Sequence, residues 1–249
     1  MLPAPGGEEG AGYPEEPDLS RRRTVFSYCL LSALAAVLLL LMAFTSSSEG
    51  AQLDIGSKLV VATAFMASCA LGIVLGARPG FLRRRGMRDA RTQAEGDREL
   101  PRLVAHHPDC GRFQDRVVSF RGRKWCGGCL GLVIGSSLAL ILMVTYLLLP
   151  DLEQEDGSPI LMMGMLLVAI SLMDLALDPR AGWRHVLANM VLVQGFFLVT
   201  VGALTATAEL SVGLLAVVIC FLWLDTRIQL SDWRHEKTCH ACGRGCGPY

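Results

Sequence analysis

The chain has 249 residues, 52% of them hydrophobic and 18% charged, and its 23 basic residues balance 23 acidic ones. Its mean hydropathy is +0.42, and its apolar residues gather in blocks without the polar faces that core helices of a large soluble protein would show. The composition therefore excludes an ordinary soluble domain. Nucleic-acid binding is not expected either, because the basic segments lack interleaved aromatic residues.

The N-terminal segment Met1–Ser20 is rich in Pro, Gly and Glu. It contains almost nothing to bury, so we expect a disordered tail. Arg21–Arg23 then precedes an apolar run, an arrangement that is also typical of a signal peptide. The run is too long for the apolar region of a signal peptide, and Ala43–Thr45 makes a poor cleavage site, so we expect an uncleaved membrane anchor.

Six apolar blocks have the length of a membrane-spanning helix, which needs about 20 residues to cross ~30 Å of hydrocarbon. The sixth block is the weakest, because Asp225 and Arg227 interrupt its last turns. The expected fold is an all-α integral membrane protein, a six-helix bundle with an N-terminal helix pair over residues 25–76 and a four-helix region over residues 130–230. The blocks are Val25–Thr45, Leu59–Gly76, Leu130–Leu149, Ile160–Leu177, Val186–Ala208 and Leu210–Leu230.

The basic residues predict the orientation of these spans. Arg21–Arg23 precedes the first block, which places the N-terminus in the cytoplasm by the positive-inside rule. Threading six spans then puts every Lys and Arg except Lys58 on the cytoplasmic side, while the external loops carry acidic residues such as Asp54 and Asp151. We therefore expect a multi-pass protein of the plasma membrane with both termini in the cytoplasm. Clustered cysteines on that side stay reduced, which favours metal binding over disulfides.

Residues 77–129 form the only sizeable polar segment between spans. Its first part, which contains Arg83–Arg85, lacks apolar periodicity and is expected to face anionic lipid headgroups, at ~1 kcal/mol per charge. Its second part has the pattern of a β-hairpin, with Arg116–Phe120 as one strand, Arg121–Arg123 as the turn and Lys124–Trp125 as the return strand.

Two pairs of metal-binding residue types flank this hairpin. His107 and Cys110 form one x-x pair and Cys126 and Cys129 the other, with fifteen residues between the pairs. An x-x spacing lets two side chains of one tight turn reach the same ion, and three Cys with one His form a closed tetrahedral set for structural zinc. His106 is the alternative to His107, although its spacing to Cys110 is one residue too long. The sequence therefore predicts one zinc ion in a small cytoplasmic, ribbon-like zinc-knuckle insert.

The C-terminal segment 231–249 is a Cys-rich tail on the same predicted side of the membrane. Cys239, Cys242 and Cys246, with His235 or His240, either hold a second metal ion or complete the first site. Thiolate sets also bind iron–sulfur clusters, so the identity of the metal stays open.

The His-x-x-Cys…Cys-x-x-Cys-x-Gly pattern that ends at Gly131, just before a membrane helix, resembles the signature of a prokaryotic family of multi-pass membrane proteins of unknown function. Members of this family tend to carry an Asp late in the next helix and an Asn at the start of the one after, as Asp174 and Asn189 do here. The resemblance covers about residues 107–195, and the N-terminal helix pair and the tail look like additions of an archaeal-type branch. It implies the architecture and gives no reaction.

Four polar residues of the later spans are costly to place in a bilayer: Asp174, Asp178, Asn189 and Asp225. Asp174 and Asp178 are four residues apart and so share one helix face, with Asp178 at the membrane boundary. Asp174 lies one turn deeper and is expected to face the bundle interior in a cluster with Asn189. These residues either form structural hydrogen bonds between helices or, with Arg184 and Arg227, line a polar vestibule that opens toward the zinc domain.

No Walker loop, Gly-x-Ser-x-Gly, His-Glu-x-x-His or dinucleotide motif occurs in the chain. A non-enzymatic role is therefore favoured, as a small-solute or ion transporter or a scaffold with a structural zinc domain. The alternative is a membrane thiol–disulfide oxidoreductase that uses Cys126 and Cys129, because the N-terminus of the following helix would favour their thiolates. An intramembrane hydrolase that uses Asp174 is the third hypothesis.

Overall fold

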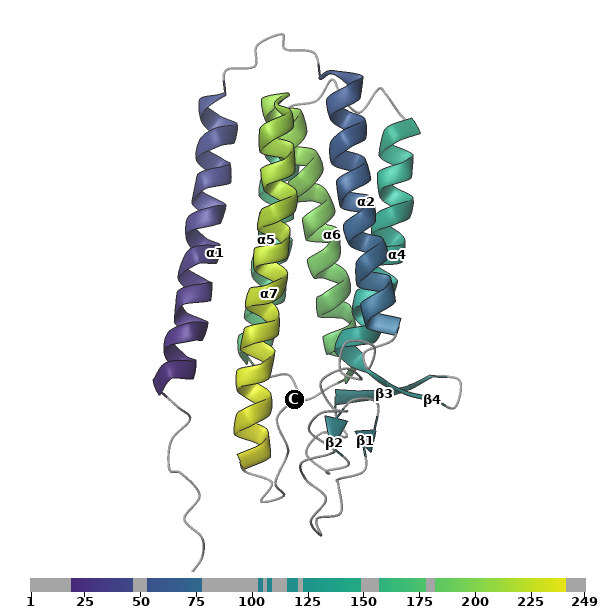
Figure 1. Cartoon of the computed structure of the whole chain (residues 1–249). Helices are drawn as coiled ribbons and strands as arrows, with labels where there is room; N and C mark the ends of the chain where they lie inside the picture. The colour runs from purple at the N-terminus through teal and green to yellow at the C-terminus, as the bar shows by residue number, and fades with distance from the viewer. Residues whose placement is uncertain are drawn as a thin grey trace, which may run out of the picture.

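The computed structural model describes residues 19–46, 53–77, 103–104, 107–108, 116–120, 123–148, 157–177 and 182–240. Within these ranges, six helices are long and apolar enough to cross a membrane (Figure 1). The predicted all-α architecture with six candidate spans is therefore confirmed. The helices are α1 (Leu19–Thr45), α2 (Ile55–Ala77), α4 (Gly127–Leu148), α5 (Gly157–Leu177), α6 (Gly182–Thr207) and α7 (Leu210–His240).

The helices extend beyond the apolar blocks, because polar residues continue the helical backbone on either side of the hydrocarbon. Helix α1 already begins at Leu19, so the last two residues of the expected disordered tail are helical, and residues 1–18 lie outside the described part. Helix α7 continues past Leu230 to His240, so the first half of the expected C-terminal tail is helical too. Helix α4 begins at Gly127 and therefore includes Cys129.

Local signals explain where two of the helices start. Asp54 caps α2, since its Oδ2 accepts a 2.9 Å hydrogen bond from the backbone nitrogen of Ser57. Helices α6 and α7 are joined only by Ala208 and Glu209. Ala208 takes a left-handed backbone conformation with a φ of 51°, which ends α6 and lets the chain reverse into α7.

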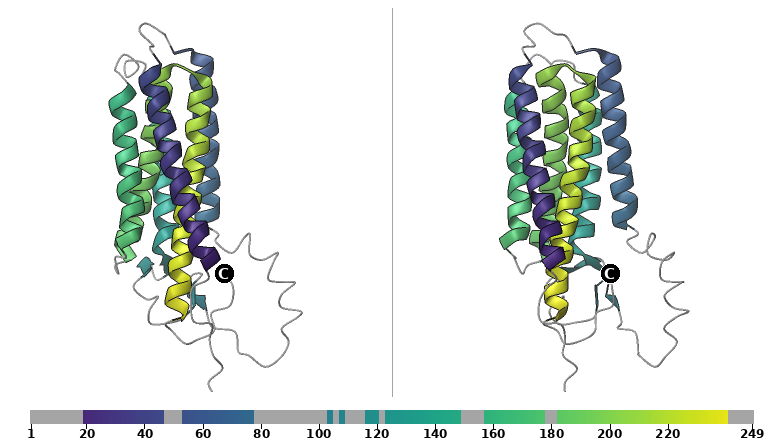
Figure 2. Two further views of the ribbon diagram at one scale, coloured as in Figure 1. Left: turned by 90° about the vertical axis from the view of Figure 1, so that its left-hand side faces the viewer. Right: turned by 60° about the vertical axis from the view of Figure 1, so that its left-hand side comes forward.

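Helix α6 is the centre of the bundle. In its membrane-spanning window 72% of the residues are buried, against 22% in α1. It packs against α4, α5 and α7, while α2 packs against α4 and α7, and α1 lies outermost against α7 (Figures 1 and 2). The predicted N-terminal helix pair, residues 25–76, therefore packs against the predicted four-helix region, residues 130–230, in one bundle.

Glycines set the close spacing around α6. A Cβ atom at Gly131 of α4 would collide with the Val186 carbonyl oxygen of α6. On another side of α6, a Cβ atom at Gly195 would lie 3.0 Å from the Gly164 carbonyl oxygen of α5. The backbones of these helices approach where a larger side chain would not fit, as is common for helix pairs in membranes.

Two short antiparallel hairpins lie before α4 in the described part of the chain. In the first, β1 (Leu103–Val104) pairs with β2 (His107–Pro108). In the second, β3 (Val117–Phe120) pairs with β4 (Arg123–Cys126), with Val117 opposite Cys126. The second is the predicted hairpin, and its return strand runs directly into α4. The strands therefore mark one end of the bundle, the hairpin end (Figure 1).

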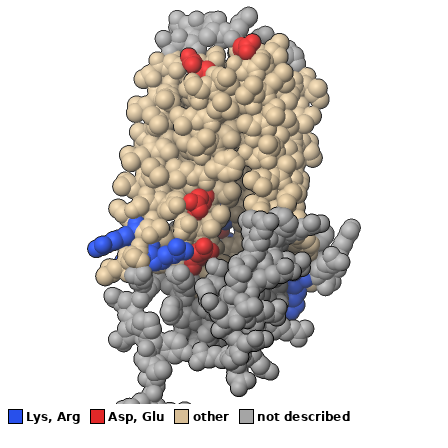
Figure 3. Space-filling view, viewed as in Figure 1, with Lys and Arg blue, Asp and Glu red and all other residues tan. Residues whose placement is uncertain are grey.

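The charged residues differ between the two ends of the bundle. Asp54 and Glu209 precede α2 and α7 at the end opposite the strands, and α1 begins with Arg21–Arg23 at the hairpin end (Figure 1). On the face in Figure 3, basic side chains lie only toward the hairpin end, and a largely uncharged band separates them from two acidic patches at the opposite end. The helices of this band are apolar enough to lie in hydrocarbon.

Candidate functional site

The two cysteines of the second x-x pair meet at the junction of β4 and α4. Cys126 is the last residue of β4 and Cys129 lies in the first turn of α4. Both are half-buried and outside any disulfide among the described residues, and the Cys129 side chain is hydrogen-bonded to Cys126. The x-x spacing therefore brings two sulfur atoms together at a helix N-terminus, which suits two of the four ligands of a tetrahedral metal ion.

The other predicted ligands lie largely outside the described part of the chain. His107 is in β2 with its backbone opposite Val104, its side chain is not described, and Cys110 falls outside the described residues. Among the residues whose side chains are described, no group of three or more His, Cys, Asp or Glu lies close enough to hold a metal ion. The zinc ligand set of His107, Cys110, Cys126 and Cys129 stays a prediction.

The predicted tail ligands begin on helix α7. His235 and Cys239 both belong to α7 and lie four residues apart near its end. Cys242 and Cys246 lie outside the described residues. The second metal ion, or the completion of the first site by these cysteines, therefore stays a prediction.

The cysteine pair packs directly onto the start of α6. A Cβ atom at Gly127 would lie 2.7 Å from the Gly182 carbonyl oxygen and 3.3 Å from the His185 Cβ. A Cβ atom at Gly128 would lie 3.5 Å from Asn189 Nδ2 and 3.7 Å from Cys126 Sγ. Gly127 thus lets the hairpin end of α4 approach the start of α6, whereas a Cβ atom at Gly128 would make only ordinary contacts.

A buried arginine organises those polar residues. Arg227 of α7 is only 5% exposed. Its Nε donates a 2.8 Å hydrogen bond to Asn189 Oδ1 of α6, and its Nη1 donates to the backbone and hydroxyl oxygens of Ser171 of α5, at 2.5 Å and 2.9 Å. Ser171 Oγ in turn donates to the Ala188 carbonyl at 2.7 Å. One guanidinium therefore joins three helices near the hairpin end.

Asp174 and His185 complete this group, the Arg227 cluster (Ser171, Asp174, His185, Asn189 and Arg227). Asp174 Oδ1 pairs with Arg184 Nη2 at 3.1 Å, and the Asp174 carboxylate also interacts electrostatically with Arg227 and His185. Asp174 Oδ2 and His185 Nε2 are buried without a hydrogen-bond partner among the described residues. Buried polar atoms are rarely left unpaired, so a water, an ion, a ligand or a residue outside the described ranges would satisfy each of these atoms.

The structure groups some of the predicted intramembrane residues and separates others. Asp174 and Asn189 both belong to the Arg227 cluster, and each bonds its own arginine. Asp225 does not join them: it is hydrogen-bonded to Tyr28 of α1 and accepts from Gln229 Nε2 at 3.5 Å, so it serves the contact between α7 and α1. Asp178 lies outside the described residues.

The sequence reasoning singled out neither His185 nor Ser171 of this cluster. A serine in an apolar helix usually bonds the carbonyl four residues earlier, as Ser137 does here with Val133. The available signal was its position three residues before Asp174, which places both side chains on the same face of α5. Comparisons of the chain with protein-family models, with curated proteins and with solved structures gave no match.

Proposed function

We propose that this protein binds and transfers a small ion or polar solute at the Arg227 cluster, beneath a cytoplasmic domain that a structural zinc ion holds together. The observation that carries the proposal is the pair of buried polar atoms, Asp174 Oδ2 and His185 Nε2, that have no partner among the described residues. They lie in one cluster with a buried cation, Arg227.

The energetics of such a cluster favour a functional role. An ionisable side chain inside a membrane-spanning segment is costly and commonly marks a substrate or ion pathway. Arg227 donates its hydrogen bonds to uncharged groups of Ser171 and Asn189, and the Asp174 carboxylate interacts with it electrostatically. Within the described ranges, Asp174 bonds through one oxygen, to the 60% exposed Arg184, and its second oxygen has no partner there. Arg184 is thus suited to act as the solvent-side partner of a buried binding site.

The zinc domain has a supporting role in this proposal. His107, Cys110, Cys126 and Cys129 form a closed ligand set, which leaves no open position for chemistry at the metal. The ion would fix the hairpin over the start of α6, where Gly127 and Gly128 already contact the polar residues. The resemblance to the prokaryotic membrane family agrees with this arrangement and adds no activity to it.

The proposal is tested by comparing two carboxylates at similar depth. The parent protein, Asp174→Asn and the control Asp225→Asn are purified in detergent, and their thermal midpoints are measured with Na⁺, K⁺, chloride and phosphate. A ligand that binds only the folded state raises the midpoint. We expect at least one ion to stabilise the parent and Asp225→Asn but not Asp174→Asn, and a flux of the same ion in proteoliposomes with the same dependence. Equal shifts in all three proteins, or no shift in any, contradict the proposal.

The oxidoreductase alternative rests on a separate observation, the contact between Cys126 and Cys129 at the N-terminus of α4. In that reaction the two thiols would lose two protons and two electrons to the disulfide of a partner protein, and would themselves form a disulfide. Metal analysis separates the two functions. Stoichiometric zinc in the purified protein favours the structural site, whereas metal-free protein with a reversible Cys126–Cys129 disulfide favours the oxidoreductase.

A further inference from the structure

The Arg227 cluster holds two opposite charges that do not pair with each other directly. Asp174 Oδ1 pairs with Arg184 Nη2 at 3.1 Å, whereas Arg227 donates its hydrogen bonds to Asn189 and Ser171. Asp174 and Arg227 are nevertheless close enough to interact electrostatically. A charged side chain inside a membrane-spanning bundle is costly unless partners satisfy it. The cluster therefore offers a negative and a positive group near each other, each suited to a further partner.

Each of these charged groups has an atom left for a ligand. Within the described ranges, Asp174 Oδ2 is buried without a hydrogen-bond partner. No described group accepts a hydrogen bond from Arg227 Nη2, because the bonds of Arg227 leave from Nε and Nη1. His185, which is 8% exposed, contributes a third such atom, Nε2. His185 interacts electrostatically with both Asp174 and Arg227, so all three atoms belong to one site.

The charges of the cluster conflict with a simple ion. A carboxylate oxygen accepts hydrogen bonds and favours an ammonium group, while a guanidinium group matches a carboxylate. A lone cation at Asp174 would lie near the positive charges of Arg227 and Arg184, and a lone anion at Arg227 would be repelled by Asp174. A solute that carries both charges meets neither conflict. The cluster therefore fits a zwitterion better than a single ion.

The spacing along α5 suits a small molecule. Arg227 Nη1 donates to Ser171 Oγ at 2.9 Å, and Asp174 follows Ser171 by three residues on the same helix. Three residues advance an α-helix by about 4.5 Å and keep both side chains on one face. The guanidinium contact and the Asp174 carboxylate are thus about one helical turn apart, a distance that a few covalent bonds can span.

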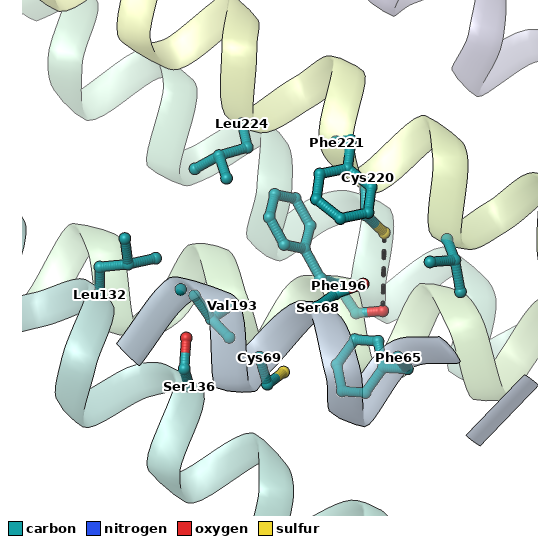
Figure 4. A pocket seen from close by; sticks show the side chains of 12 residues that line it. Phe65, Ser68, Cys69, Leu132, Ser136, Val193, Phe196, Cys220, Phe221 and Leu224 are labelled. Atoms are coloured by element: carbon teal, nitrogen blue, oxygen red, sulfur yellow. Dashed lines mark hydrogen bonds between the residues drawn. The ribbon is translucent and has the colours of Figure 1, made fainter. Parts of the chain in front are cut away.

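The surroundings of the cluster favour entry from the hairpin end. Arg184, the partner of Asp174, is 60% exposed at that end. Toward the opposite end the contact between α6 and α7 is apolar, because Phe196 stacks on Trp223 with ring centroids 6.4 Å apart. The apolar pocket in Figure 4 lies on that side, and the Cys220 thiol in its wall already donates to the Phe196 carbonyl. Such walls would not attract a molecule with two charges.

We propose that the solute of the Arg227 cluster is a small zwitterion with one ammonium and one carboxylate group, as in an amino acid. This inference rests on the function proposed above and specifies its substrate. The ammonium group would donate to Asp174 Oδ2 and the carboxylate would accept from Arg227 Nη2, with His185 Nε2 as a further contact. Each single ion that tests the proposed function would occupy one half of this site.

The experiment compares zwitterions with their two charged halves. Glycine, β-alanine and γ-aminobutyrate carry both groups at increasing separation, whereas methylammonium and acetate carry one group each. Dissociation constants of the full chain in detergent are obtained from the rise of the thermal midpoint with ligand concentration. The proteins are the parent, Asp174→Asn, Arg227→Gln and the control Asp225→Asn, because Asp225 is hydrogen-bonded to Tyr28 of α1 instead of joining the cluster.

We expect at least one of the three amino acids to bind the parent and Asp225→Asn about tenfold more tightly than methylammonium or acetate does, because its two groups bind as one molecule. Asp174→Asn should bind that amino acid only as tightly as acetate. Arg227→Gln should bind it only as tightly as methylammonium, and Asp174→Asn decides alone if Arg227→Gln fails to fold. A purely structural role of either residue would leave the advantage of the amino acid unchanged.

Three other results would contradict the proposal in different ways. Equal affinities of the parent for amino acids and single ions would overturn the zwitterion and leave the proposed ion site intact, whereas no binding of any probe would overturn both. Tight amino-acid binding that persists in Asp174→Asn would overturn the role of this carboxylate. Tighter binding of phosphoethanolamine than of every amino acid would overturn the choice of a carboxylate.

Discussion

Arg227 Nε donates a 2.8 Å hydrogen bond to Asn189 Oδ1, and this contact connects the last membrane-spanning helix to the central one. The same guanidinium reaches the Ser171 carbonyl on α5 through Nη1. The planar guanidinium group presents donors on separate nitrogen atoms and so reaches acceptors on different helices, whereas the three donors of an ammonium group share one nitrogen atom. The relative position of α5, α6 and α7 at the hairpin end therefore depends on the shape of one side chain as well as on its charge.

The first prediction concerns Arg227→Lys. The variant keeps the charge but loses the hydrogen bond to Asn189 or the one to Ser171, and a buried bond to a charged group is worth about 1.5–3 kcal/mol. We expect the free energy of unfolding to fall by about 2 kcal/mol, measured by denaturant titration in detergent. Arg22→Lys, at an exposed position of α1, should change it by less than about 0.5 kcal/mol. If Arg227→Lys were as stable as the parent, the hydrogen bonds of the Arg227 guanidinium group would not be what holds these helices together.

The second prediction concerns two glycines of α4 that lie three residues apart. Gly131→Ala should lower the free energy of unfolding by about 1–3 kcal/mol, because its Cβ would collide with the Val186 carbonyl of α6. Gly128→Ala should not lower it, because its Cβ would lie at ordinary contact distances of 3.5 Å and 3.7 Å and alanine favours a helix. Thermal midpoints of the two variants test the packing, and equal effects would contradict it.

The third prediction is that Cys126→Ser removes one zinc ion per chain. Serine cannot supply the thiolate that a Cys₃His site needs. Cys29→Ser is the control, because Cys29 is exposed on α1, the outermost helix. Zinc content is measured by inductively coupled plasma mass spectrometry on protein purified without chelators. Unchanged zinc in Cys126→Ser would remove Cys126 from the ligand set, and loss of zinc in Cys29→Ser would point to unfolding instead.

The number of candidate spans and the position of the β3–β4 hairpin could be predicted from the sequence, because both depend on local patterns. Runs of apolar residues specify membrane-spanning helices almost without regard to their neighbours. The hairpin follows from alternation around the expected Arg121–Arg123 turn, although the structure places Arg123 in the return strand, opposite Phe120. The ends of the helices were harder to predict, because an apolar pattern does not indicate that α7 continues through polar residues to His240.

The Arg227 cluster could be predicted only in part, because its partners come from three helices. The depth of Asp174 and Asn189 in their spans indicated a buried position, and the structure places both in the cluster. The sequence could not assign Asp225 to the contact with Tyr28, since that depends on how α7 rotates about its axis. Which face of a helix meets which neighbour is decided by close packing, such as that at Gly131, rather than by the residue's own chemistry.

The last prediction concerns the membrane orientation, with the hairpin end in the cytoplasm. The basic residues Arg21–Arg23 begin α1 at that end, and Arg184 near the start of α6 lies at the same end, as the positive-inside rule requires of a cytoplasmic face. Alkaline phosphatase inserted between residues 151 and 156, in the connection opposite the hairpin, should be active in a bacterial host, whereas a fusion after Tyr249 should be inactive. Green fluorescent protein at the same two positions should give the reverse result. It becomes fluorescent in the cytoplasm but does not fold correctly after export through the general secretory route. An active phosphatase at Tyr249 would invert the topology, and the argument that Cys126 and Cys129 stay reduced and bind metal would fail with it.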